Sequence, residues 1–149
     1  FGKQGRGYTV DSLIETLTNI LGLDRRWNSC VVGVGRLGKA IINYPGFVPE
    51  GFKIISAFDN DVNKIGQSVN DIKILPMNMI RSTVEKHDIK IAILAVPATS
   101  AQNVITELVD TDIKAILNYA PIAPKVPPTL ILRNIDPVLS LQSMTYYLQ

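Results

Sequence analysis

The sequence predicts an α/β fold with a doubly wound, mostly parallel sheet of the Rossmann type. Short apolar segments alternate with segments of helical period along the 149 residues, and this alternation is typical of parallel strands joined by helical crossovers. A glycine cluster at residues 33–38 directly follows the first apolar segment of this kind and opens a helix. Hydrophobic residues make up 46% and charged residues 19% of the chain, which indicates one well-packed domain.

The expected elements follow from the apolar period and from the residues that end each segment. Thr9 caps a first helix, which Gly22 ends. The continuously apolar run from Lys90 to Val96 predicts a strand buried on both faces. We expect strands at residues 30–32, 52–58, 71–75 (an edge strand), 90–96, 114–117 and 129–132, and helices at residues 9–21, 37–44, 76–85, 100–109 and 136–149.

These elements divide the chain into three parts. Residues 1–8 are rich in glycine and cations and are expected to be the remnant of an interdomain linker. Residues 9–135 form the Rossmann domain, and residues 136–149 form a C-terminal helix. The chain opens on Phe1 rather than on Met, which indicates a fragment or a trimmed chain.

The glycine cluster has the G-x-G-x-x-G spacing of a dinucleotide-binding turn, in its full strand–turn–helix context. Gly33 permits the tight turn, Gly35 lets the backbone approach a pyrophosphate, and Gly38 lets the helix and strand pack closely. The helix N-terminus then holds the phosphates, with Arg36 beside them. The predicted phosphate site consists of Gly33, Val34, Gly35, Arg36, Leu37 and Gly38.

An acidic residue supplies the second requirement of this site. Asp59 follows Gly38 by 21 residues and ends the second expected strand. A carboxylate at this position accepts the ribose hydroxyls and repels a 2′-phosphate. Asp61 lies two residues on and no Arg or Lys is adjacent. The sequence therefore predicts NADH or NAD⁺ as the cofactor, in preference to the phosphorylated forms.

Composition excludes several other classes of protein. The net charge of +2 does not indicate a nucleic-acid surface by itself. No apolar run is long enough to cross a bilayer, and no signal peptide is visible. The one cysteine, Cys30, cannot form an internal disulfide and is expected to be a buried apolar residue. We expect a cytoplasmic protein with no membrane contact.

The sequence favours a protein that binds and senses a ligand over an enzyme. The one histidine, His87, precedes the strand expected at 90–96 and so lies at the amino end of the sheet, whereas ligands bind outside the carboxyl ends. No spacing typical of a metal site or of a nucleophile with its base is present, so we expect no catalytic residue and no metal. Two alternatives stay open: the cofactor domain of an NAD-dependent dehydrogenase and a regulatory NAD module of a transport system.

Apolar residues follow two of the expected strands where a nicotinamide ring would lie. They are Ala95, Val96 and Pro97 on one strand, and Asn118, Tyr119, Ala120 and Pro121 on the next. Such a pocket suits the uncharged reduced ring and disfavours the cationic oxidised ring, which is costly to desolvate. The same residues can equally be explained as strand ends and loop packing.

The C-terminal helix indicates a protein partner. Its apolar residues spread around too much of the helix circumference to face one core, so something else must cover them. A second subunit is the simplest cover. The residues concerned are Val138, Leu139, Leu141, Met144, Tyr146, Tyr147 and Leu148.

Motifs along essentially the whole chain resemble those of the Rex family of bacterial redox-sensing transcriptional repressors. They are residues 1–8, 21–27, 33–38, 57–59, 93–98, 116–121 and 134–136. The resemblance implies a homodimer that reads the NADH/NAD⁺ ratio and releases operator DNA when NADH binds. It also implies that the C-terminal helix is swapped between subunits. Tyr44 and Asp136 would then form a contact that responds to the nicotinamide state.

The sequence departs from the family pattern in one respect. Family members begin with a winged-helix DNA-binding domain, and these residues do not include it. We therefore expect this chain to be the sensor and dimerisation part, with operator DNA bound by the domain that it lacks.

Overall fold

The computed structural model describes residues 26–148 and contains one seven-stranded sheet. The helix expected at residues 9–21 and the linker expected at residues 1–8 lie outside the described residues. The strands are β1 (Trp27–Val32), β2 (Phe52–Phe58), β3 (Ser68–Val69), β4 (Ile72–Leu75), β5 (Ile89–Leu94), β6 (Ala115–Asn118) and β7 (Ile131–Asn134). The α-helices are α2 (Arg36–Asn43), α3 (Ile80–Lys86), α4 (Ala98–Val109) and α5 (Pro137–Tyr146), and the 3₁₀ turns are η1 (Val48–Glu50) and η2 (Met77–Met79).

The sheet is doubly wound, as expected. Its order is β3-β4-β2-β1-β5-β6-β7, and every pair is parallel except β3 with β4. The chain leaves β1 toward β2 on one side and later returns to β5 on the other side, so the strand order reverses beside β1. Ligands bind at such a switch point in open α/β sheets.

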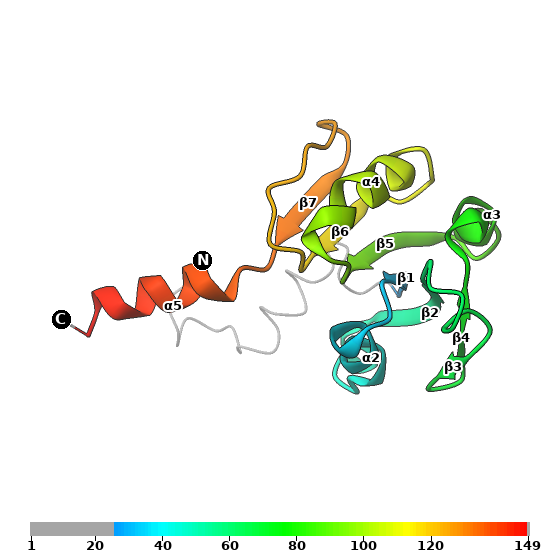
Figure 1. Ribbon diagram of the computed structural model, residues 1–149, viewed down its shortest axis with the longest axis horizontal. Helices are drawn as coiled ribbons and strands as arrows, with labels where there is room; N and C mark the ends of the chain where they lie inside the picture. The colour runs from blue at the N-terminus through cyan, green and yellow to red at the C-terminus, as the bar shows by residue number, and fades with distance from the viewer. Residues whose placement is uncertain (1–25, 149) are drawn as a thin grey trace, which may run out of the picture.

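Two apolar clusters cover the two faces of the sheet. Alternate residues of β1 belong to different clusters, because neighbouring side chains of a strand point to opposite faces. Cys30 and Val32 pack with α3 and α4, whereas Val31 packs with Ile41 and Ile42 of α2. Figure 1 shows α2 on one side of the sheet and α3 and α4 on the other.

Several elements differ from the expected ones. Strand β1 begins three residues earlier than expected, β5 ends two residues earlier and α4 begins two residues earlier. The strand expected at the edge, β4, pairs with the two-residue strand β3 (residues 68–69). Two residues are too few to show a strand period, so the sequence does not predict β3. The last strand, β7, begins two residues later than expected, at Ile131. The helix after Pro76 begins as the 3₁₀ turn η2 before it continues as α3. None of these differences moves the glycine cluster or Asp59.

Helix α5 extends away from the sheet (Figure 1). Asp136 caps it as expected, because its Oδ1 accepts a hydrogen bond of 3.1 Å from the Val138 N–H. Leu141 and Met144 are exposed over 59% and 60% of their surface, and Tyr146 over 75%. The described apolar side chains of α5 therefore remain largely exposed in a single chain.

Candidate dinucleotide-binding site

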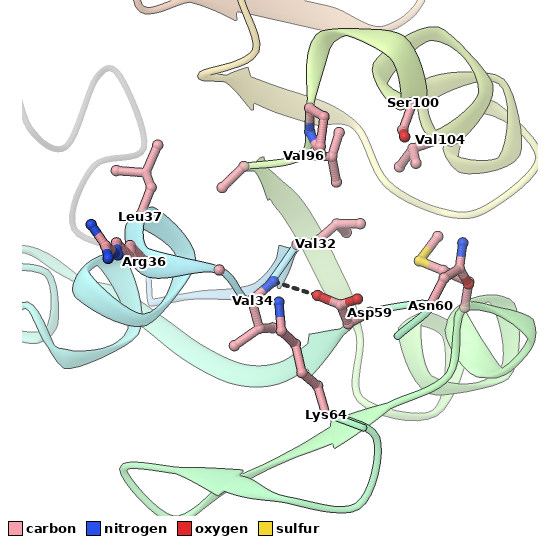
Figure 2. A pocket seen from close by; sticks show the side chains of 15 residues that line it. Val32, Val34, Arg36, Leu37, Asp59, Asn60, Lys64, Val96, Ser100 and Val104 are labelled. Carbon is pink, nitrogen blue, oxygen red and sulfur yellow. Dashed lines mark hydrogen bonds between the residues drawn. The ribbon is translucent and has the colours of Figure 1, made fainter. Parts of the chain in front are cut away.

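A cavity of about 460 Å³ lies where β1, β2 and β5 end, within the size range of small-molecule sites. Figure 2 shows its side chains converging from the glycine cluster, from the end of β2 and from α4. The lining residues are Val32, Gly33, Val34, Gly35, Arg36, Leu37, Asp59, Asn60, Lys64, Met77, Ala95, Val96, Pro97, Ser100 and Val104.

Two glycines of the cluster are required by the protein's own packing. Gly33 has φ +95°, and a Cβ atom there would lie 2.5 Å from the carbonyl oxygen of Ala95. A Cβ atom at Gly38 would collide with the carbonyl oxygen of Gly33. A larger residue at position 33 would push the turn away from the end of β5, and a larger residue at position 38 would push α2 away from the turn.

Gly35 is different, because a Cβ atom there would meet nothing within 4 Å. Gly35 is also the N-cap of α2, without a side-chain cap, and the first turn carries no acidic residue. The first N–H groups of a helix have no intrahelical partner. The start of α2 thus presents unpaired N–H groups and the positive end of a helix dipole beside open space, which suits an anion.

The Asp59 carboxylate joins the end of β2 to the glycine cluster. Its Oδ2 accepts a hydrogen bond of 2.8 Å from the Val34 N–H, and its Oδ1 accepts one of 2.8 Å from the Asp61 N–H. Together the two bonds fix the direction of the carboxylate. Because each oxygen has a second lone pair, the carboxylate can still accept hydroxyl groups from a ligand.

Lys64 is the one charged residue among the lining residues that sequence reasoning missed, the others being Val32, Asn60, Met77, Ser100 and Val104. The chain after Asp59 turns back, with the Asp61 carbonyl accepting hydrogen bonds from the Lys64 and Ile65 N–H groups. This turn brings the Lys64 side chain to the cavity wall on the side of Val34 and Asp59 (Figure 2). The one available signal was its separation of five residues from Asp59, which is too weak to interpret without the turn.

The two apolar strand ends occupy different places. Ala95, Val96 and Pro97, after β5, line the cavity. Residues 118–121, at and after the end of β6, are not among the lining residues. The Tyr119 N–H nevertheless donates to the Leu94 carbonyl at 2.9 Å, so Tyr119 lies beside the end of β5. The side chain of Asn118 is fully buried and bonds to the protein itself.

Tyr44 and Asp136 lie at opposite edges of the sheet within one chain. Helix α2 starts at the carboxyl end of β1 and runs back, so Tyr44, its C-cap, lies toward the amino edge. There its ring contacts the Phe47 ring edge-on, with centroids 4.8 Å apart. Asp136 instead follows the carboxyl end of β7 and caps α5.

The remaining candidates for chemistry lie away from the cavity. Cys30 is buried in β1, and burial raises the pKa of its thiol to about 12, so it is the apolar residue that the sequence predicts. His87 is exposed at the end of α3, away from the carboxyl edge. Among residues 26–148, no three His, Cys, Asp or Glu side chains gather as metal ligands. No helix in the described part of the chain is long and apolar enough to cross a membrane.

A doubly wound sheet, a glycine turn that leads into an uncapped helix and a carboxylate at the end of β2 define a dinucleotide-binding Rossmann domain. Comparison with known proteins identifies the family within this class of dinucleotide-binding domains. Residues 24–122 match the family model described as the CoA binding domain. The redox-sensing transcriptional repressor Rex of Chloroflexus aurantiacus is 49% identical, in an alignment that covers 99% of this chain and 70% of the relative.

Solved structures agree with this relationship. The repressor RSP, in complex with beta-NAD+ and operator DNA, is 38% identical with a TM-score of 0.89, over 99% of this chain and 68% of RSP. RSP in complex with beta-NADH is 37% identical with a TM-score of 0.87, over 95% of this chain and 68% of RSP. This chain belongs to the Rex family of redox-sensing transcriptional repressors.

Proposed function

We propose that this chain is the NADH/NAD⁺-sensing and dimerisation part of a redox-responsive repressor. The observation that carries the proposal is the open space at Gly35, where unpaired N–H groups at the start of α2 lie beside the oriented Asp59 carboxylate. RSP, a related repressor, has been solved both with beta-NADH and with beta-NAD+ and operator DNA. One site that holds both redox states of one cofactor is what a sensor needs.

In this proposal the residues around the cavity hold successive parts of the cofactor. The start of α2 holds the pyrophosphate, Asp59 holds the adenosine ribose, and the residues after β5 and β6 surround the nicotinamide. The proposed cofactor-binding residues are Gly33, Val34, Gly35, Arg36, Leu37, Gly38, Asp59, Ala95, Val96 and Pro97, to which we add Lys64 from the same cavity wall. Tyr119, Ala120 and Pro121 are proposed to approach the nicotinamide from beside β5, whereas the side chain of Asn118 is fully buried and holds Ala120 in place.

The site distinguishes the two cofactors by the charge of the nicotinamide. Ala95, Val96 and Pro97 offer no acidic side chain to the ring. A cationic ring must lose its hydration there without a counter-ion, whereas the neutral reduced ring loses little. NADH therefore binds more tightly, and this difference in affinity is what can shift the repressor between two arrangements.

Dimerisation through α5 completes the proposed function. The exposed apolar side chains of α5 need a cover, and a second copy of the chain supplies it. Since Tyr44 and Asp136 lie at opposite edges of one sheet, we propose that they meet across the dimer, with Tyr44 from one protomer and Asp136 from its partner.

We further propose that operator DNA is bound through a winged-helix domain outside these residues, in the cytoplasm, and that the chain performs no catalysis. Calorimetric titration with NADH and with NAD⁺ tests the sensor. We expect NADH to bind at least about tenfold more tightly, a difference of about 1.4 kcal/mol. Equal affinities for NADH and NAD⁺ would overturn the proposed sensor function. Steady oxidation of NADH with a small carbonyl compound would favour the dehydrogenase alternative.

A further inference from the structure

Asn118, at the end of β6, is a fully buried polar residue whose side chain joins two different segments. Its Oδ1 accepts a hydrogen bond of 3.0 Å from the Ala120 N–H, and its Nδ2 donates to the Ala120 carbonyl at 3.1 Å. The same Nδ2 donates to Oδ1 of Asn134 at 2.9 Å. Because a backbone N–H can only donate, the Ala120 N–H fixes which end of the amide carries oxygen.

The backbone of Asn118 strengthens this connection. Its carbonyl accepts a hydrogen bond of 2.8 Å from the Ile135 N–H. Asn134 and Ile135 directly precede Asp136, whose carboxylate caps α5. Asn118 thus holds the last residues before α5 by both its side chain and its backbone.

The other side of Asn118 leads toward the cavity. The Tyr119 N–H donates to the Leu94 carbonyl at 2.9 Å, at the end of β5. The next two residues of the chain, Ala95 and Val96, follow β5, line the cavity and fill the space that a Cβ atom at Gly33 would need. A continuous path of backbone and hydrogen bonds therefore runs from Ala95 and Val96 through Leu94 to residues 119–120, and from there to the amide of Asn118.

We infer that Asn118 is a positioning residue that links the cofactor cavity to the base of α5, and that its bond to Asn134 carries the link. This inference rests on the proposed function, since it describes how an NADH-dependent change reaches the dimer helix. The bonds to Ala120 hold the loop, whereas the bond to Asn134 sets the direction in which α5 leaves the sheet. A mobile junction at this point would decouple the helix from the cofactor.

Asn134→Ala is the informative variant, because Asn134 is exposed and its loss leaves the two bonds between Asn118 and Ala120 in place. Asn134→Asp keeps an oxygen acceptor for the Asn118 amide and serves as the conservative rescue. Arg133→Ala is the matched control, because Arg133 is also exposed on β7 and its guanidinium donates to the carbonyl of its own neighbour Leu132.

Each variant is labelled on α5 through Gln142→Cys with a red-emitting, environment-sensitive dye, since the native Cys30 is buried. We expect the dye emission of the otherwise unchanged chain to differ between NADH and NAD⁺. Asn134→Ala should lose more than about half of this difference while its NADH affinity changes less than about threefold. Asn134→Asp and Arg133→Ala should retain the difference.

The outcomes separate this inference from the proposed function. The link through Asn118 is overturned if Asn134→Ala keeps the full difference in dye emission between NADH and NAD⁺. It is also overturned if the dye in the otherwise unchanged chain does not respond although NADH binds preferentially. Both results leave the proposed sensor function intact. Equal affinity for NADH and NAD⁺ in the unchanged chain overturns the proposed function, and the inference with it.

Discussion

The Val34 N–H donates a hydrogen bond of 2.8 Å to Oδ2 of Asp59, across 25 residues of sequence. This bond joins the two parts of the dinucleotide fingerprint, the glycine turn and the acidic residue, before any cofactor arrives. It fixes the carboxylate where a ribose would lie and therefore reduces the entropy that binding must cost. The bond also means that Asp59 serves both the fold and the ligand, so its two roles need separate tests.

Asp59→Asn keeps one oxygen for the Val34 N–H but loses the negative charge and the acceptor of the Asp61 N–H, whereas Asp59→Ala loses both bonds. We expect Asp59→Asn and Asp59→Ala to weaken NADH binding by about 1–3 kcal/mol, through the loss of charge-assisted hydrogen bonds to the ribose. Calorimetric titration measures the change. Asp61→Asn is the control, since Asp61 is exposed and its carboxylate accepts from the Asn63 N–H. Unchanged affinity in Asp59→Asn would mean that the ribose lies elsewhere.

Substitution of the glycines distinguishes a ligand requirement from a packing requirement. A Cβ atom at residue 35 meets open space, so we expect Gly35→Ala to lose at most the roughly 1 kcal/mol of a poorer N-cap but to weaken NADH binding at least tenfold, about 1.4 kcal/mol. Gly35→Val, with its larger side chain, should weaken binding further. Gly33→Ala must adopt φ +95° beside the Ala95 carbonyl, and we expect it to lose about 2 kcal/mol of stability or more. Thermal denaturation and titration of these variants give the comparison. Native affinity in Gly35→Val would place the pyrophosphate away from α2.

A charge on the exposed apolar side of α5 should dissociate the dimer. We expect Leu141→Glu to raise the dimer dissociation constant about thirtyfold, because burying a leucine contributes about 2 kcal/mol. Sedimentation velocity over a range of concentrations measures this constant. Gln142→Glu adds the same charge one residue further along the helix, where the side chain is also exposed. If both variants dimerise equally well, α5 is not the interface.

The buried thiol of Cys30 predicts a specific loss of stability at alkaline pH. Its pKa rises from 9.0 to about 12 on burial, so the unfolded thiol ionises at a pH at which the folded thiol does not. The contribution of Cys30 is complete below pH 9 and falls by about 1.4 kcal/mol per pH unit as the pH rises toward 12. Denaturant unfolding at pH 8 and pH 10 should show a steeper loss for the native chain than for Cys30→Ala. Equal losses would mean that Cys30 is accessible to water.

Much of the fold and part of the site could be predicted from the sequence, because these features depend on short-range patterns. The apolar run before Gly33 and the continuous run of β5 identify two central strands by period and composition. The separation of 21 residues between Gly38 and Asp59 is one crossover long, so it places the acid at the neighbouring strand end. The cap of α5 by Asp136 is likewise a local feature.

The tertiary structure decided what depends on pairing between distant segments. The sequence predicts a separate role for each glycine, and the approach of β5 and α2 supplies the contacts behind these roles: a Cβ atom at Gly33 would meet Ala95, one at Gly38 would meet Gly33, and one at Gly35 would meet nothing within 4 Å. The turn after Asp59 brings Lys64 to the cavity. Asn118, predicted as a ligand contact, is buried against Asn134, 16 residues away. Periodicity reports which face a residue occupies, whereas its partners there depend on the order and register of the strands.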